Sequence, residues 1–477
     1  MRDNSNRVWQ TLWSSPQTSR RVIYIFIALL ISTWVGIRYA QSAYIQTTPI
    51  FIWLYAILMA FLFLYPRQGA ALFRFSLSRT WGGLILLVAA AFALRLYNLE
   101  HLPPGLHGDE SGSMSFAFEQ IFHPANGGLT IHPLRSGLDS QPVFYSYILY
   151  YSAKLFGYTI AGDRMTSAIV GALAVAGTFL LVDEMADRKT AWFAAFLVTA
   201  YHYHIHWSRI GLSNIWVTLL MPLCIGLFLR GWRLRAGSGA MWAGVCLGLT
   251  AYLYTGGYVL IFLLGVVILY TAWKTNEKAG YIIYTGRMLT VAIVIALPLM
   301  IFALVWPEAF LDRAVTIYGW SPAAVTSTLG ENATSWQYFI YQVVHSFGAY
   351  NYYSDVTGFY APQIPFLIGI SSVLFLGGIV LSFYQRQYFA LFWMALVTLL
   401  GGVMTVGTPG SSHFIPVIPA ICWLVAMPLR WLQETKYRNW AYLLLAGIIL
   451  TDLYFYFVIY ANNPSYDFRL EFPNPNP

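Results

Sequence analysis

Charged residues are scarce in this chain. Asp, Glu, Lys and Arg make up 10% of its 477 residues, whereas an ordinary soluble domain has roughly 25%. Cysteine is scarcer still: the three cysteines, Cys224, Cys246 and Cys422, all lie in apolar runs. Neither a disulfide framework nor a cysteine-based metal site is therefore expected. The same scarcity of charge excludes a sizeable soluble domain.

Long apolar runs fill most of the chain instead. Hydrophobic residues account for 58% of it, and runs near 20 residues recur, each long enough to cross a hydrocarbon core of about 30 Å. Thirteen membrane spans are predicted, near 22–41, 49–65, 80–98, 164–183, 190–207, 212–231, 238–255, 257–273, 288–306, 363–384, 388–406, 413–430 and 439–460. The stretch 143–157 is ambiguous, because it is apolar but short, rich in Tyr, and contains Lys154.

The distribution of Lys and Arg resolves this ambiguity. If 143–157 stays outside and the N-terminus is cytoplasmic, twelve downstream Lys and Arg residues fall in cytoplasmic loops and four lie outside. That bias agrees with the positive-inside rule. We therefore predict an interfacial helix at 143–157 on the outer leaflet, in a multi-pass protein of the cell (plasma) membrane with an extracytoplasmic C-terminus. Cytoplasmic loops also account for the net charge of +8, so no nucleic-acid partner is expected.

This topology divides the chain into five regions. They are a cytoplasmic N-terminus with two extra transmembrane helices (1–79), a core (80–306) with the first long external loop (99–163), a second long external loop (307–361), C-terminal transmembrane helices (362–460) and an external tail (461–477).

The first external loop contains the sequence His107-Gly108-Asp109-Glu110, followed by a predicted short helix over 111–122. Carboxylates at the start of a helix are favoured by the helix dipole and stay ionised. Asp109 is therefore either a candidate catalytic group or simply an N-cap.

Two arginines, Arg164 and Arg209, lie at the external ends of predicted spans. Ionisable groups at such positions are costly unless they are used, and the guanidinium fork suits phosphate recognition. The alternative is that each arginine anchors its helix at the membrane interface.

In order along the chain, Asp109-Glu110, QPVFYSY, DRMTSAIVGALAV and SRIGLSN resemble the GT-C superfamily of membrane glycosyltransferases. Within that superfamily, they resemble the protein O-mannosyltransferase and aminoarabinose transferase (glycosyltransferase family 39-like) group. HFIPVIPA, which contains His413, resembles a basic-residue-plus-prolines element of this family. The resemblance is close over residues 80–260. It implies an all-α polytopic membrane protein of about 13 transmembrane helices with GT-C architecture and interfacial helices in its two long extracytoplasmic loops.

The resemblance also implies a reaction: inverting transfer of a sugar from a polyprenyl-phosphate donor to a lipid, glycan or protein acceptor at the external face. The phosphate leaving group needs no general acid, so one carboxylate can serve as general base. By resemblance Asp109 is that base and Glu110 assists it. The donor phosphate would be bound by Arg164, Arg209 and His413, with His107, Asp139 and Asn214 supporting the acceptor or the site. No cofactor is expected, and a divalent metal is possible but not favoured.

The chain departs from the family at several points. Asn214 and His413 stand where many relatives have an acidic residue and an arginine, and two extra spans precede the core. These departures favour a second hypothesis, a non-catalytic GT-C-like subunit of a membrane assembly whose extra helices contact a membrane protein partner. A secondary transporter is less consistent with the sequence, which shows no paired repeats. The aromatic residues of 307–361 either stack on a sugar or form an interfacial belt.

Overall fold

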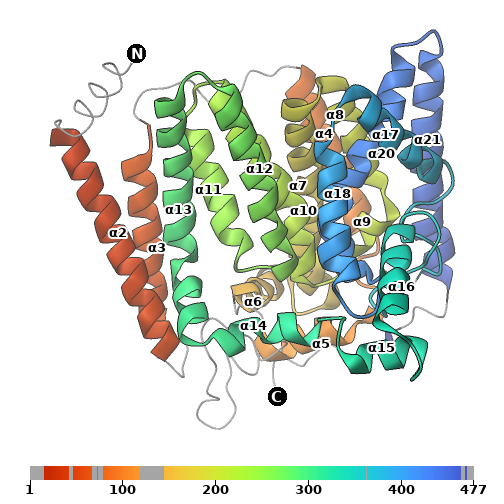
Figure 1. The fold of residues 1–477 in the computed structure, drawn as a ribbon, viewed down its shortest axis with the longest axis horizontal. Coiled ribbons are helices and arrows are strands. Elements are labelled where there is room, and N and C mark those ends of the chain that lie inside the picture. Colours follow the sequence, from red (N-terminus) through yellow and green to blue (C-terminus); the bar gives the residue numbers. More distant parts are fainter. Residues whose placement is uncertain are drawn as a thin grey trace. The chain divides into compact units, whose positions relative to one another are not determined.

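A computed structural model of the chain describes residues 16–41, 47–66, 72, 79–117, 144–360, 362–463 and 468–469 (Figure 1). These residues form helices and connecting turns, together with two strands of two residues each and one isolated bridge. The predicted all-α class is confirmed. Asp139, one of the predicted site residues, lies outside the described ranges.

The chain folds into two compact units, each assembled from separate segments of sequence. The first contains residues 1–74, 124–144 and 224–311, and the second contains residues 75–123, 145–223 and 312–477. Helices α10 (Trp216–Arg233) and α14 (Pro307–Thr316) contain boundaries between these segments.

The first unit is built around one long helix, α13 (Lys278–Val305). The other helices of this unit are α2 (Pro16–Gln41), α3 (Thr47–Leu64), α11 (Ser238–Thr250), η3 (Thr255–Tyr258) and α12 (Val259–Lys274). Of these, α2, α3, α11 and α12 all pack against α13. Apolar side chains of α2, α3 and α13, among them Val35, Trp53 and Ile295, form one buried cluster.

A proline inside α13 explains how α2 and α3 attach to it. Pro298 has no N–H, so the carbonyl of Val294 four residues earlier loses its helical partner. That carbonyl instead accepts hydrogen bonds from Ser32 Oγ of α2 at 2.9 Å and from Trp53 Nε1 of α3 at 3.2 Å. Because no water is available in a bilayer core to replace such bonds, this shared acceptor ties the two N-terminal helices to the unit.

The second unit contains all of the predicted site residues that the structure describes. Its helices before α10 are α4 (Arg79–Leu96), α5 (Gly108–Ser115), α6 (Phe144–Phe156), α7 (Ile160–Met185), α8 (Arg188–Ala200), α9 (His202–Trp207) and η2 (Ser213–Ile215). The later ones are α15 (Pro322–Leu329), α16 (Ser335–Gly348), α17 (Ile370–Gln385), α18 (Phe389–Thr398), η4 (Leu399–Val403), α19 (Ser411–Phe414), η5 (Ile415–Val417), α20 (Ile418–Gln433), α21 (Arg438–Tyr454), η6 (Phe455–Ile459) and η7 (Tyr460–Asn462). β1 (Gly105–Leu106) pairs in parallel with β2 (Phe468–Arg469).

Helix α20 is the centre of this unit, packed by α8, α17, α18 and α21. Its close contact with α17 depends on a glycine. A Cβ at Gly378 would lie 2.0 Å from the carbonyl oxygen of Leu424, which is itself the acceptor that Pro428 leaves without its helical N–H. The missing side chain therefore allows the two backbones to approach.

Each of the predicted span ranges contains a helix. In the described part of the chain, seven helices are long and apolar enough to cross a membrane, and five shorter apolar helices accompany them. The chain is therefore a multi-pass membrane protein, and the count of 13 spans stays a prediction. The ambiguous segment forms α6, whose 13 residues extend only about 20 Å, short of the roughly 30 Å core.

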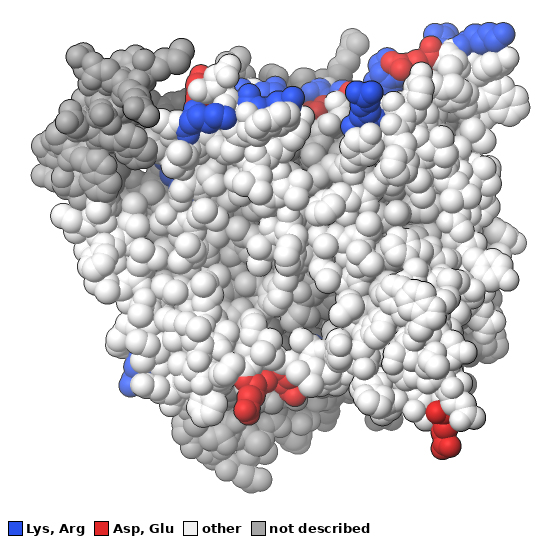
Figure 2. Space-filling view, viewed as in Figure 1, with Lys and Arg blue, Asp and Glu red and all other residues white. Residues whose placement is uncertain are grey.

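Charge is unevenly placed along the helices. On the face shown in Figure 2, Lys and Arg side chains gather at one end of the helices of each unit. In the second unit, an ion pair of 3.1 Å at that end joins Arg430, in the last turn of α20, to Asp187, the N-cap of α8. The 26 residues of α7, roughly 40 Å of helix, separate this end from the end that holds α5.

Candidate active site

The N-terminus of α5 is capped by His107. Its backbone is extended, its Nδ1 accepts a hydrogen bond of 3.1 Å from the backbone N–H of Asp109, and its own N–H donates to Glu110 Oε2 at 3.1 Å. This is a capping box built on histidine. The N-cap is therefore His107 and not Asp109, and α5 begins at Gly108, three residues before the predicted helix.

Glu110 is fully buried, and both of its carboxylate oxygens are engaged. Oε1 accepts from Arg164 Nε at 2.9 Å and from the backbone N–H of Gly211 at 2.6 Å. Oε2 accepts from Arg164 Nη2 at 3.0 Å, in addition to the His107 backbone. Arg164 thus makes a bidentate pair with this carboxylate, the strong form of such contacts.

Arg164 is also fully buried, and each of its five N–H groups has a partner. Beyond Glu110, its guanidinium donates to the carbonyls of Leu99 at 3.3 Å, Pro103 at 3.0 Å and Gly105 at 2.6 Å. The side chain therefore fixes the path of the loop from α4 to α5. This geometry leaves no N–H of Arg164 for a phosphate and weighs against the predicted donor contact.

Arg209 has a similar environment at the end of α4. Its N–H groups donate to the carbonyls of Leu94 at 2.9 Å, Arg95 at 2.8 Å, Tyr97 at 2.5 Å and Leu102 at 3.2 and 2.8 Å. The last carbonyls of a helix lack helical partners, and a cation beside them is favoured by the dipole. Arg209 is thus a C-terminal cap of α4, with all five donors in use.

The two adjacent carboxylates consequently differ. Glu110 is closed off by its partners, whereas Asp109 is partly exposed at the second position of α5. Its backbone is held by the capping bond to His107. Of the pair, Asp109 is the carboxylate that a substrate can reach.

The ring of His107 stacks on Phe359 of the second long loop, with centroids 4.2 Å apart. Burial lowers the pKa of His107 below its ordinary value of 6.5, and the nearby charges of Asp109 and Glu110 oppose this only partly. The imidazole is therefore neutral at pH 7. Because Nδ1 accepts the Asp109 N–H, Nε2 holds the ring proton.

The alternating histidines of α9 attach this second loop to the helices. His206 Nε2 bonds the Phe359 carbonyl at 2.8 Å, and His202 Nδ1 bonds the Tyr360 hydroxyl at 2.7 Å. His204 Nδ1 lies 2.7 Å from Arg95 Nη2. The three rings are thus used in hydrogen bonds and aromatic packing. In the described residues no group of three or more His, Cys, Asp or Glu side chains is arranged to hold a metal ion.

Asn214 and His413, two other predicted site residues, lie on other elements of the second unit. Asn214 is buried in η2. His413 in α19 is partly exposed, its Nδ1 lies 3.2 Å from Thr405 Oγ1, and it is close enough to Arg313 for their charges to interact. Nothing in the sequence connects Arg313 with His413, which lies 100 residues further along the chain.

The sequence did not predict the roles of three further buried charged residues. Arg95 donates to the carbonyls of Val198 and Thr199 at the end of α8, both at 3.3 Å. Asp163, next to Arg164 in DRM, is fully buried beside Glu110. The sequence gives few signals for these roles, because the acceptors of Arg95 are backbone carbonyls.

Asp355 is the third of these residues. Its Oδ1 accepts from the backbone N–H of Thr357 at 2.9 Å and from that of Ser411 at 3.0 Å. Burial raises its pKa to about 6, although these bonds favour the charged form. Asp355 therefore joins the second long loop to the first residue of α19, the short helix that contains His413.

Comparisons with known proteins agree with this fold. The model of the dolichyl-phosphate-mannose-protein mannosyltransferase family matches residues 140–306, a segment that contains Arg164 and Arg209 but not Asp109. No curated protein sequence matches the chain.

Among solved structures, the chain is similar to the oligosaccharyltransferase of Archaeoglobus fulgidus in its apo form, with a TM-score of 0.53, 14% identity, 84% of this chain and 57% of that chain covered. It thus spans little more than half of that enzyme. ArnT from Cupriavidus metallidurans, bound to undecaprenyl phosphate, gives a TM-score of 0.51 at 14% identity, with 82% of this chain and 77% of that chain covered. The archaeal oligosaccharyltransferase AglB from Archaeoglobus fulgidus, in complex with an inhibitory peptide and a dolichol-phosphate, gives a TM-score of 0.50 at 14% identity, with 83% of this chain and 57% of that chain covered. The predicted resemblance to the GT-C glycosyltransferases is confirmed at the level of fold.

Proposed function

We propose that this chain, a multi-pass membrane protein with the GT-C fold, transfers a sugar from a polyprenyl-phosphate donor to an acceptor hydroxyl. The observation that carries the proposal is the division between the two carboxylates of α5. Both oxygens of Glu110 are bound in a buried ion pair with Arg164. This pair holds the neighbouring Asp109 at a fixed and accessible position.

In the proposed reaction Asp109 acts as general base. It takes the proton from the acceptor hydroxyl as the hydroxyl oxygen attacks the anomeric carbon, and the bond from that carbon to the donor phosphate breaks. The phosphate leaves as a stable anion, so no acid is needed. A single in-line displacement of this kind inverts the anomeric configuration. Neutral His107 supports Asp109 through its capping bond.

We assign the phosphate contacts by asking which of the predicted basic side chains have N–H donors that no protein group already uses. All N–H groups of Arg164 and Arg209 have protein partners, so we assign both as positioning residues. His413, partly exposed and near Arg313, is the predicted phosphate contact that the geometry favours. A histidine binds phosphate well only when protonated. The single negative charge of the donor phosphodiester would favour that protonation, and more so when the phosphate gains a second charge as it leaves.

We further propose that transfer takes place on the outer face of the plasma membrane, to a lipid, glycan or protein acceptor. The N-terminus would be cytoplasmic and the C-terminus extracytoplasmic. Support comes from the basic residues at those helix ends of the second unit that lie remote from α5, since Lys and Arg mark cytoplasmic loops. Asp139 and Asn214 stay predictions for acceptor support.

The proposal is tested by incubating the purified full chain with polyprenyl-phosphate sugars and a membrane extract as acceptor source. We expect release of polyprenyl phosphate that depends on the extract, and a glycosidic bond of opposite anomeric configuration to the donor. Retention of configuration would contradict a single displacement by the acceptor hydroxyl with Asp109 as general base. Release that is equally fast without acceptor would indicate hydrolysis rather than transfer.

A non-catalytic GT-C-like subunit is the second candidate. The full engagement of Arg164 and Arg209 favours it, as do the added helices α2 and α3, which would serve as the surface for a membrane protein partner. This candidate predicts no turnover with any polyprenyl-phosphate sugar, and loss of a co-purifying membrane protein when residues 1–74 are replaced by an unrelated two-helix segment.

A further inference from the structure

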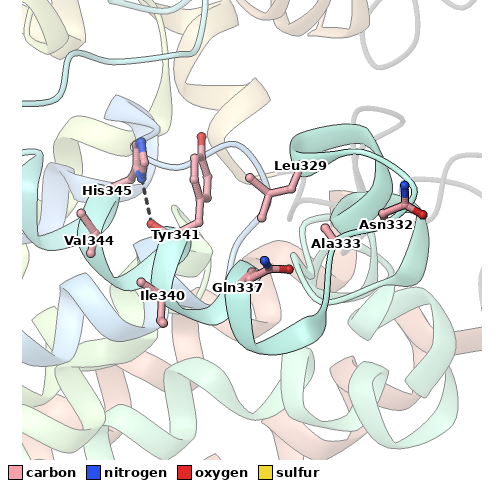
Figure 3. Close-up of a pocket in the computed structure, with 8 residues that line it drawn as sticks. All are labelled: Leu329, Asn332, Ala333, Gln337, Ile340, Tyr341, Val344 and His345. Atoms are coloured by element: carbon pink, nitrogen blue, oxygen red, sulfur yellow. Dashed lines mark hydrogen bonds between the residues drawn. The ribbon is translucent and has the colours of Figure 1, made fainter.

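A groove lies between the last turn of α15 and the exposed side of α16, in the second long loop (Figure 3). Its volume is about 510 Å³, within the range of about 300–1,000 Å³ typical of ligand sites. The lining side chains are Leu329, Asn332, Ala333, Gln337, Ile340, Tyr341, Val344 and His345. None of them belongs to the site around α5.

The walls of the groove are set by local structure. α15 ends at Gly330, whose φ of +93° turns the chain back, and α16 starts with a capping box between Thr334 and Gln337. In that box Gln337 Oε1 accepts from Thr334 N at 2.9 Å and from its Oγ1 at 3.0 Å. The carbonyl side of this amide is thereby fixed, and its NH₂ group is presented at the groove as a donor (Figure 3).

The aromatic side of the groove is rigid. His345 is stacked between Tyr341 and Tyr353, with centroids 3.8 and 3.9 Å apart. Its Nδ1 lies 2.9 Å from the Tyr341 carbonyl, an acceptor, so Nδ1 holds the proton and Nε2 is left as an acceptor. Aromatic rings held in place offer contact area at low entropic cost.

The chemistry of the lining decides the class of ligand. The groove combines donors and acceptors of neutral side chains with the ring of Tyr341 and the apolar surface of Ile340 and Val344. No Lys, Arg, Asp or Glu is among its lining residues in the described chain, so a phosphate or a carboxylate would meet no opposite charge there. A neutral, hydroxyl-rich ring with one apolar face fits these groups.

We propose that this groove is a saccharide-binding site for neutral sugars, separate from the reacting centre at Asp109. The sugar would lie with its apolar face against Tyr341, and its hydroxyls would bond Gln337, Asn332 and His345 Nε2. The site does not depend on the proposed transfer reaction, because a non-catalytic protein with this groove would bind the same sugars.

The test is direct binding to the purified full chain by saturation-transfer difference NMR. The probes are neutral di- and trisaccharides of glucose, galactose, mannose and N-acetylglucosamine, each paired with its sugar phosphate. We expect at least one neutral probe to bind, with transfer to its ring C–H protons, and its phosphate to bind more weakly. Y341A should weaken binding about tenfold, a loss of about 1.4 kcal/mol, because the sugar loses the fixed aromatic face on which it lies.

Two further variants keep the test decisive if Y341A fails to fold. Trp336 is 66% exposed on α16 and does not line the groove, so W336A is the matched control and should bind normally. L329W fills the groove from the opposite wall and should also weaken binding. The proposal is overturned if no neutral probe binds, if the sugar phosphates bind more tightly, if L329W binds normally, or if W336A and Y341A weaken binding equally.

Discussion

Arg164 and Arg209 use their guanidinium groups for the same purpose at two places in the site. Arg164 places three of its five N–H donors on backbone carbonyls and two on Glu110, and Arg209 places all five on backbone carbonyls. Lysine could not replace either one, since an ammonium has three donors and lacks the planar fork. At the residue scale, the loop that presents Asp109 is thus stabilised by arginines that themselves have no donors left for substrate.

The variant R164K tests this role. We expect a loss of about 1–3 kcal/mol of unfolding free energy, because lysine keeps the charge beside Glu110 but leaves buried backbone carbonyls without donors. The measurement is denaturant unfolding in detergent. R188K is the matched control: Arg188 pairs with Asp183 but its side chain is 51% exposed, so the change should cost about 1 kcal/mol or less. Equal losses in the two variants would show that Arg164 is not structural.

His107 predicts a pH dependence. Burial lowers its pKa in the folded protein below the value of 6.5, so the unfolded chain binds the proton more readily. The stability that neutral His107 contributes is therefore present above pH 6.5 and is lost as the pH falls through 6.5 towards the folded pKa. The slope is at most about 1.4 kcal/mol per pH unit, and less because the ring is partly exposed.

This dependence is isolated by comparison with H107N, since asparagine is a good N-cap that does not titrate. Thermal stability measured from pH 8 to pH 5 should fall more steeply for the natural chain than for H107N. Parallel curves would mean that His107 does not titrate on unfolding.

The sequence predicts which loop holds the reactive carboxylate better than it predicts the role of each residue in that loop. Asp109 and Glu110 are adjacent and chemically alike, and only the position of Arg164, 54 residues away, distinguishes them. The phosphate role for Arg164 and Arg209 could not be checked from sequence, because both backbone carbonyls and a lipid phosphate attract an arginine at a helix end. Arg95 lies inside an apolar run, and nothing local marks its acceptors.

At the scale of elements, prolines in the long helices determine where neighbouring helices attach. Apolar runs predict the helices because each must be long enough to cross the bilayer. They do not predict partners, since Pro298 leaves the Val294 carbonyl open and only the fold supplies Ser32 and Trp53. The length of α6 was predictable for the same reason as the spans, from its short apolar run.

The double variant S32A/P298A tests this attachment. We expect S32A alone to cost about 0.5–1.5 kcal/mol, as one of two bonds to a buried carbonyl is lost. In the P298A background the Val294 carbonyl regains its helical N–H, so S32A should then cost close to nothing. T33A is the control, because Thr33 bonds Leu29 within α2. An equal cost of S32A in both backgrounds would refute the link.

At the scale of the whole molecule, the sidedness of the membrane depends on the assignment of α6 as interfacial. Positions 331 and 436 of the second unit are both exposed and are predicted to lie on opposite sides. The three natural cysteines are buried, which suits labelling of introduced ones. In intact cells an impermeant maleimide should label E331C and should reach K436C only after permeabilisation. The reverse pattern would mean that 143–157 crosses the membrane.

The central claim is that Asp109 is the base and that its neighbours position it. Its most direct test is turnover by purified D109N with a polyprenyl-phosphate sugar, beside a thermal melt of the same sample. We expect turnover to fall by about 10²–10⁴-fold, the usual contribution of a general base, with an unchanged melting temperature, because Asp109 is partly exposed. Turnover equal to that of the natural chain would contradict the claim.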